Sequence, residues 1–252
     1  MFAMKRRPGR ARCDRPAWSC FGWRAGSRRA LGWVIVSIGI AFTPMGWAQD
    51  PTRFETEIRA FEEQVAKSPL TNRSVIFYGS SSFRMWTGLS GDFPQFTVLN
   101  RGFGGAQLSD LNYFVDRVIR PVDALAILIY GGDNDIADGK PPEQVLTDFK
   151  LLVAQIRKLK GGIPVGFVAV KPSPSRLALL HEQHRANRLV REWASTQAGV
   201  SYLEIVTPML DKKGAPKPEL FLEDQLHMNR EGYAIWKVAL EPWIARALNS
   251  KP

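Results

Sequence analysis

The sequence predicts an α/β fold in three layers, with a mainly parallel five-stranded sheet between two layers of helices. Segments with strand and helix character alternate along residues 54–248, which is the order found in βαβ units. The longest apolar runs, residues 75–78 and 124–130, show no alternation with polar residues, as expected for parallel strands buried on both faces. No repeat, low-complexity tract or linker interrupts residues 50–250, so we expect one domain there.

The individual elements follow from the periodicity of apolar residues. Strands are expected at residues 75–78, 96–99, 124–130, 164–170 and 200–205. Helices are expected at about residues 54–65, 108–118, 142–159, 176–196 and 229–248. Proline and glycine set several boundaries: Pro121 ends the second helix, Pro142 opens the third and Gly161 closes it.

The first 48 residues differ in composition from the rest of the chain. They hold nine of the 34 Lys and Arg residues but only one of the 24 acidic residues, Asp14. The remainder carries 25 basic and 23 acidic residues, so the formal net charge of +10 belongs almost entirely to this leader. The folded part therefore offers no basic face for nucleic acid, and we expect no nucleic-acid partner.

The leader has the plan of a secretory signal peptide. Basic residues occupy positions 5–29, an uncharged apolar segment follows at 31–42, and Gly46 and Ala48 supply the small residues that a signal peptidase reads. The apolar segment is shorter than the roughly 20 residues of a membrane-spanning helix, although an uncleaved anchor is the alternative. We expect export to the periplasm or the medium with cleavage after Ala48. Because residues 28 and 29 are both arginine, the sequence leaves open whether the general secretory or the twin-arginine route is used.

Both cysteines, Cys13 and Cys20, lie in the leader. The mature chain would have no disulfide framework, no thiolate metal site and no cysteine nucleophile. His181 and His184 are three residues apart on an expected helix, but no third ligand lies near them in the sequence, so we assign them to a solvated face. We expect neither a metal ion nor an organic cofactor.

Polar or glycine-rich turns follow three of the expected strands. Ser81 follows the first, Gly105 lies in a glycine-rich turn after the second, and Asn134 follows the third. The carboxyl ends of parallel strands meet at one edge of the sheet, where open α/β sheets bind ligands. Ser81 is placed there as a nucleophile would be; the alternative is a serine-rich turn, with Gly105 and Asn134 serving only as turn or cap residues.

Near the C-terminus, Asp224 and His227 are three residues apart. If residues 224–227 form a helical turn, the two side chains can meet. A carboxylate on one imidazole nitrogen fixes the tautomer, so that the other nitrogen can take a proton from a serine. The alternatives are that Asp224 caps the last helix and that His227 is a partly buried histidine without a catalytic role.

Four blocks of sequence, in order, resemble the SGNH hydrolases, also called GDSL lipases or acylhydrolases. The blocks are residues 79–81, 100–105, 132–135 and 224–227. The resemblance covers residues 74–248 and implies a flavodoxin-like fold and an esterase that works through an acyl-enzyme. It divides the chain into a signal peptide (residues 1–48), an N-terminal helix with its connection (residues 49–72) and a hydrolase domain (residues 73–250).

The resemblance also implies a role for each residue of the site. Ser81 is the nucleophile and gives a backbone N–H to the oxyanion hole, Gly105 gives a second backbone N–H, and Asn134 gives a side-chain N–H. His227 is the base, and Asp224 orients it. The chain departs from the family at Ser80, where aspartate is usual; this removes no catalytic group, but it bears on loop geometry and pH behaviour.

The substrate is predicted less sharply than the chemistry. No lid insertion is apparent between the strands, which favours small acyl groups such as the acetyl esters of carbohydrates. The alternatives are a lysophospholipase or thioesterase, and a catalytically silent carbohydrate- or lipid-binding module on the same fold. The sequence leaves the oligomeric state open, and we expect no membrane anchor once the leader is removed.

We predict that the leader is removed on export, because its basic region, short apolar segment and small residues match a signal peptide. N-terminal sequencing of the exported protein should begin at or near Gln49. A membrane-bound product that still begins at Met1 would contradict this prediction.

Overall fold

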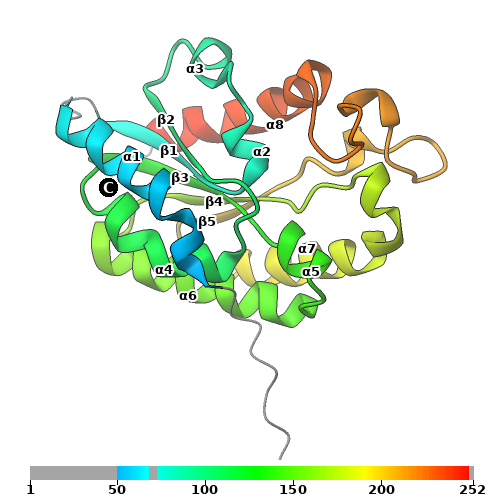
Figure 1. Cartoon of the computed structure of the whole chain (residues 1–252), viewed down its shortest axis with the longest axis horizontal. Helices are drawn as coiled ribbons and strands as arrows, with labels where there is room; N and C mark the ends of the chain where they lie inside the picture. The colour runs from blue at the N-terminus through cyan, green and yellow to red at the C-terminus, as the bar shows by residue number, and fades with distance from the viewer. Residues whose placement is uncertain (1–49, 68–72, 250–252) are drawn as a thin grey trace, which may run out of the picture. The chain divides into compact units, whose positions relative to one another are not determined.

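The computed structural model describes residues 50–67 and 73–249, and the five strands in these ranges form one parallel sheet (Figure 1). The order across the sheet is β2-β1-β3-β4-β5, and all four pairings are parallel. The strands are β1 (Ser74–Gly79), β2 (Val98–Gly102), β3 (Ala124–Tyr130), β4 (Val165–Val168) and β5 (Val200–Leu203). The predicted class, α/β with a five-stranded parallel sheet in three layers, is confirmed.

Helices connect the strands. The α-helices are α1 (Glu55–Lys67), α2 (Ser81–Arg84), α3 (Leu89–Asp92), α4 (Leu108–Ile119), α5 (Asp133–Ala137), α6 (Pro142–Lys160), α7 (Leu180–Ala194) and α8 (Arg230–Asn249). Short 3-10 helices are η1 (Pro51–Phe54), η2 (Pro174–Leu179), η3 (Thr207–Met209) and η4 (Pro218–Leu220).

The sheet separates two apolar cores because successive side chains of a strand point to opposite faces. In β1, Ile76 and Tyr78 pack into the core shared with α1, α4, α6 and α7. Val75 and Phe77 pack into the other core, which is shared with α2, α3 and α8. Figure 1 shows α8 in red on one side of the sheet and α4 and α6 in green on the other.

The structure changes the bounds of several predicted elements: β4 ends at Val168 rather than at residue 170, β5 ends at Leu203 rather than at residue 205, and two further changes affect the site. The second strand begins at Val98 rather than at residue 96 and continues to Gly102, because residues assigned to the following turn pair with β1 as far as Gly79. The helix predicted from residue 176 begins as the 3-10 segment η2, with Arg176 outside the helical region at φ −116° and ψ 26°, and becomes α-helical only at Leu180.

Close backbone packing brings the carboxyl ends of the central strands together. A Cβ atom on Gly79 would lie 2.3 Å from the carbonyl oxygen of Tyr130, so only glycine lets β1 end this close to β3. The N–H of Ser80 extends the pairing by donating to the same carbonyl at 3.1 Å. Gly132, with φ +100°, then turns the chain from β3 into α5. The first residues of α2 and α5 therefore lie at one edge of the sheet.

The leader predicted in residues 1–48, with both cysteines, lies outside the described residues. Within residues 50–67 and 73–249, no helix combines the length and the apolar character that a membrane crossing requires.

Candidate active site

Ser81 is the first residue of α2 and directly follows the turn at the end of β1. It is half-buried, whereas Ser80 and Ser82 on either side are buried. Its backbone N–H belongs to the first turn of α2, where the helix offers no acceptor. Both the hydroxyl and this N–H of Ser81 are therefore available at the edge of the sheet where a ligand would bind.

The structure brings the three residues of the predicted triad into contact, although Ser81 and His227 are 146 positions apart. The Nε2 atom of His227 lies 3.0 Å from the Oγ atom of Ser81. The Nδ1 atom of His227 lies 2.6 Å from the Oδ2 atom of Asp224. With Nδ1 protonated towards Asp224, Nε2 is left as an acceptor for the serine proton, which is the arrangement that a general base needs.

Asp224 meets His227 through a different local structure from the helical turn that the spacing suggested. Gln225, between them, has φ +52°, and the Oδ1 atom of Asp224 accepts the backbone N–H groups of Leu226 and His227, each at 2.9 Å. Nor does Asp224 cap the last helix, because Asn229 does so by accepting from Gly232.

The environment of Asp224 keeps its carboxylate ionised. Partial burial raises its pKa, but the hydrogen bonds from the His227 ring and from two backbone N–H groups outweigh this and lower the pKa to about 2. The carboxylate is therefore charged across the neutral range and can stabilise a protonated imidazole.

The two other predicted oxyanion donors lie after β2 and β3. Gly105 is exposed, has φ +80°, and has no other heavy atom within 4 Å of the place where a Cβ would lie. The Nδ2 atom of Asn134, in α5, donates to the carbonyl of Ala106 at 3.0 Å, next to Gly105. Within the part of the chain that the structure describes, the second N–H of this carboxamide has no acceptor, so it remains available to a ligand.

The sequence analysis missed Arg176, which fixes the other end of the Asn134 side chain. Its guanidinium donates to the Oδ1 atom of Asn134 at 3.0 Å and pairs with the Oδ1 atom of Asp133 at 2.6 Å. The carboxamide of Asn134 is thus held with its oxygen towards a cation and its nitrogen towards Ala106. Arg176 is in η2, after the loop that follows β4, a strand end that carries none of the residues predicted for the site.

Asp133 is fully surrounded by donors. Besides Arg176, its carboxylate contacts Lys171 at 3.2 Å, Gln183 at 3.1 Å and the hydroxyl of Tyr130 at 3.2 Å. Burial raises its pKa, but the charges of Lys171 and Arg176 outweigh burial and hold the pKa below its ordinary value. Two basic side chains therefore face the one carboxylate beside Asn134, and burial lowers the pKa of one of them, Lys171.

Asp135, which follows Asn134, stabilises the turn from β3 into α5. Its carboxylate accepts the backbone N–H groups of Gly132 at 3.1 Å and Leu108 at 3.2 Å and pairs with Lys140 at 3.0 Å. Burial raises its pKa and the Lys140 charge opposes that rise. Asp133 and Asp135 therefore hold α5 in place, and Asn134 is left to face the site.

His181 and His184 lie on the exposed face of α7, away from the triad. Among the described residues, His181 has the neighbouring Glu182 as its polar partner, with Nδ1 at 2.9 Å from Oε1. In residues 50–67 and 73–249, no group of three histidine, cysteine or acidic side chains is arranged to hold a metal ion.

Comparison with known proteins shows the family of this chain and proteins that share its fold. Residues 74–235 match the model of the GDSL-like Lipase/Acylhydrolase family. A GDSL-like lipase from Bacteroides thetaiotaomicron is similar in structure, with a TM-score of 0.62 and 20% identity over 79% of this chain and 98% of that one. The search of curated proteins gave no match.

Two esterases of known structure share the fold at lower identity. A carbohydrate esterase family 3 protein from Talaromyces cellulolyticus has a TM-score of 0.59 and 12% identity over 72% of this chain and 100% of that one. A mutant acetyl-xylooligosaccharide esterase from Geobacillus has a TM-score of 0.56 and 13% identity over 71% of this chain and 95% of that one.

We predict that Asn134→Ala lowers kcat by roughly 10²–10³, about 2.7–4 kcal/mol, because one oxyanion donor is lost. KM should change little, since the contact forms only in the transition state. Asn134→Asp should be at least as harmful, because it opposes a developing negative charge with another. Steady-state kinetics on a soluble ester and a thermal melt check both variants.

Arg176→Gln is the matched companion, because it disturbs the orientation of Asn134 without removing the donor. It should lower kcat in the wild-type background and have little further effect on kcat in Asn134→Ala, as a double-mutant cycle would measure. An Asn134→Ala protein with an unchanged melting temperature and full kcat would remove Asn134 from the mechanism.

Proposed function

Because the chain belongs to the GDSL-like lipase and acylhydrolase family, whose chemistry is the hydrolysis of esters, we propose that it is an exported serine esterase with Ser81 as its nucleophile. The single observation that supports this most strongly is the unbroken chain of contacts from the Ser81 hydroxyl through His227 to Asp224. A catalytically silent binding module would have no need of this arrangement.

The proposed reaction has two halves. His227 takes the proton of Ser81 as its oxygen attacks the ester carbonyl, and the oxyanion is met by the N–H groups of Ser81 and Gly105 and by the carboxamide of Asn134. The tetrahedral intermediate collapses, and His227 gives its proton to the departing alcohol. A water molecule, deprotonated by His227, then attacks the acyl-enzyme and restores Ser81.

We further propose that the substrates carry short acyl groups, acetylated carbohydrates among them. Two structural neighbours are named as a carbohydrate esterase and an acetyl-xylooligosaccharide esterase, and the second name specifies an acetyl ester of a carbohydrate. The connection between β5 and α8, residues 204–229, contains η3 and η4 and carries Asp224 and His227 themselves, so it is part of the structure that holds the triad. The leader supports the proposal that the enzyme works in the periplasm or outside the cell.

We predict that a fluorophosphonate labels Ser81 and that Ser81→Ala abolishes labelling. His227→Ala should lower kcat by roughly 10⁴ or more, the scale of loss seen when a triad histidine is removed. His181→Ala and His184→Ala are the matched controls and should keep wild-type turnover, because their side chains lie on the exposed face of α7. Mass spectrometry of the labelled protein and steady-state rates provide the measurements; an unlabelled, folded wild-type protein would favour the silent binding module.

We predict that kcat/KM falls as the acyl chain lengthens from acetyl to butyryl to dodecanoyl in a series of nitrophenyl esters. The alcohol is constant across the series, so only the acyl side is tested. A clear preference for the dodecanoyl ester would refute the short-acyl proposal and favour the lysophospholipase alternative.

A further inference from the structure

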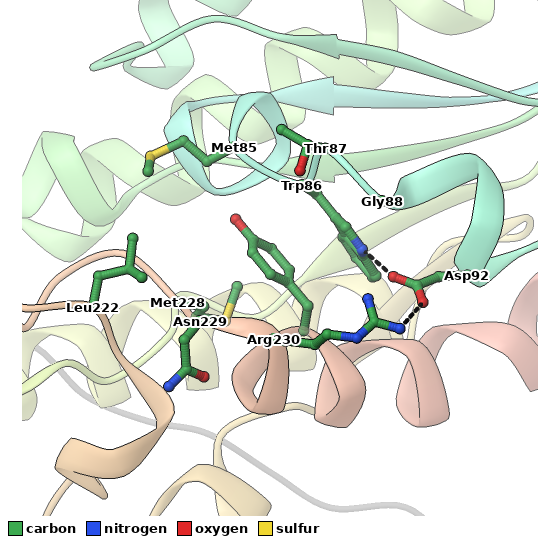
Figure 2. Close-up of a pocket in the computed structure, with 10 residues that line it drawn as sticks. Met85, Trp86, Thr87, Gly88, Asp92, Leu222, Met228, Asn229 and Arg230 are labelled. Carbon is green, nitrogen blue, oxygen red and sulfur yellow. Dashed lines mark hydrogen bonds and ion pairs between the residues drawn. The ribbon is translucent and has the colours of Figure 1, made fainter.

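A cleft of about 270 Å³ opens beside the triad, between the segment that joins α2 to α3 and the start of α8 (Figure 2). Met85, Trp86, Gly88 and Asp92 line it from the α2–α3 side. Leu222, Met228, Arg230 and Tyr233 line it from the α8 side.

The cleft adjoins the triad through direct neighbours of Ser81 and His227. The N–H of Met85 donates to the carbonyl of Ser81 at 2.8 Å, which is one turn of α2. The N–H of Leu222 donates to the carbonyl of His227 at 2.8 Å, and Met228 is the residue after His227. Both walls therefore begin within one turn or one residue of the triad.

Two of the three proposed oxyanion donors, Gly105 and Asn134, belong to elements that pack on the other face of the sheet. Gly105 leads into α4, whose first residue Leu108 packs in the core opposite to that of α8, as does Ile136 of α5, two residues after Asn134. Trp86 and Met228, in the cleft wall, belong to the core of α2, α3 and α8. Ser81 therefore lies between the donors Gly105 and Asn134 on one side and the cleft on the other.

This division decides which part of an ester faces the cleft. In the tetrahedral intermediate the oxyanion points to its N–H donors, and the departing alcohol oxygen must be close to His227 in order to receive its proton. The alcohol therefore leaves on the His227 side. Building on the proposed esterase function, we propose that this cleft binds the alcohol portion of the substrate, and that this portion is a polyhydroxylated ring such as a sugar.

The apolar half of the cleft suits the C–H surface of such a ring. Figure 2 shows Met85 and Leu222 on opposite sides of the cleft, and both side chains are partly exposed. The Tyr233 ring stacks on Trp86 with centroids 4.9 Å apart, and its hydroxyl donates to the carbonyl of Ser82 at 2.9 Å. Tyr233 is buried and held in place, so it backs the cleft as a fixed apolar residue, while Met85 and Leu222 offer the exposed apolar surface.

The polar half supplies a hydroxyl acceptor. The Oδ2 atom of Asp92 accepts the indole N–H of Trp86 at 2.7 Å, and Oδ1 lies 3.6 Å from Arg230. These contacts hold the carboxylate at the end of the cleft away from Met85 and Leu222, as Figure 2 shows, and leave it lone pairs for further hydrogen bonds. A hydrocarbon chain would cover this carboxylate without giving it a donor, which is unfavourable, whereas a ring hydroxyl would donate to it.

The experiment compares wild-type protein with Gly88→Leu. A Cβ on Gly88 would lie 3.6 Å from both Arg230 Nη1 and Asp92 Oδ2, which is ordinary contact distance, so a larger side chain can fill the polar end. Gly91→Leu, three residues further on in α3, is the matched control, because a Cβ there meets no heavy atom of the described residues within 4 Å beyond its chain neighbours, and Gly91 does not line the cleft. Asp92→Asn removes the charge while keeping an acceptor for Trp86.

The measured quantity is the ratio of kcat/KM for an acetylated monosaccharide to kcat/KM for methyl acetate, in which the acyl group is the same. Gly88→Leu should lower this ratio about tenfold or more, on the scale of one misfitted group in a specificity pocket. Asp92→Asn should also lower it, and Gly91→Leu should leave it at the wild-type value. Gly88→Leu should also lower the share of acetyl-enzyme that is transferred to an added monosaccharide rather than to water.

An unchanged ratio in Gly88→Leu would overturn the inference. So would a Gly88→Leu protein that instead changes its preference among acyl lengths at constant alcohol, because the cleft would then bind the acyl group. These outcomes leave ester hydrolysis by Ser81 intact. A folded wild-type protein that hydrolyses neither acetyl ester would overturn the proposed function and this inference with it.

Discussion

The contacts around the buried carboxylate of Asp133 hold the candidate site together. They join the end of β3, the loop after β4, η2 and α7 through Tyr130, Lys171, Arg176 and Gln183. Removing one partner of a buried ion pair typically costs about 3–5 kcal/mol, because the other charge is left without compensation. This network determines where α5 lies, and therefore where Asn134 can present its N–H. Since the folded-state pKa of Asp133 is lowered, its contribution to stability is present at neutral pH and is lost as the pH falls through that lowered pKa.

The segment η2, which carries Arg176, also contacts the turn between Asp224 and His227. Arg176 of η2 binds Asn134, while the N–H of Ser175, one residue earlier, donates to the carbonyl of Gln225 at 3.1 Å. Gln225 lies in the turn between Asp224 and His227 and has a positive φ, which only its surroundings can maintain. One short segment therefore supports both the oxyanion donor and the turn that aligns the base.

What the sequence could predict follows from the range of the interactions involved. Strand β3 was predicted at both ends, because an uninterrupted apolar run between polar turns is a local signal. The end of β2 was wrong, since β2 continues to pair with β1 as far as Gly102, where a Cβ would meet the backbone of α2. Arg176 and Lys171 were missed because each meets Asp133 across about 40 residues of chain, and neither belongs to a local pattern. The turn at Gln225 was misread for a related reason: a three-residue spacing fits a helical turn and this turn equally well.

The contacts of Ser80 explain how the chain accommodates its departure from the family at this position. Ser80 is buried, and its side chain makes no capping hydrogen bond to α2. The hydrogen bonds of Ser80 are made by its backbone. Its N–H donates to the carbonyl of Tyr130, and its carbonyl accepts from the N–H of Phe83 at 3.0 Å and of Arg84 at 3.1 Å. These bonds fix the turn that carries Ser81, and they need no particular side chain. A carboxylate at this buried position would require its own partner, whereas a hydroxyl is far less costly to bury. Serine at position 80 therefore keeps the geometry of the nucleophile without adding a charge beside it.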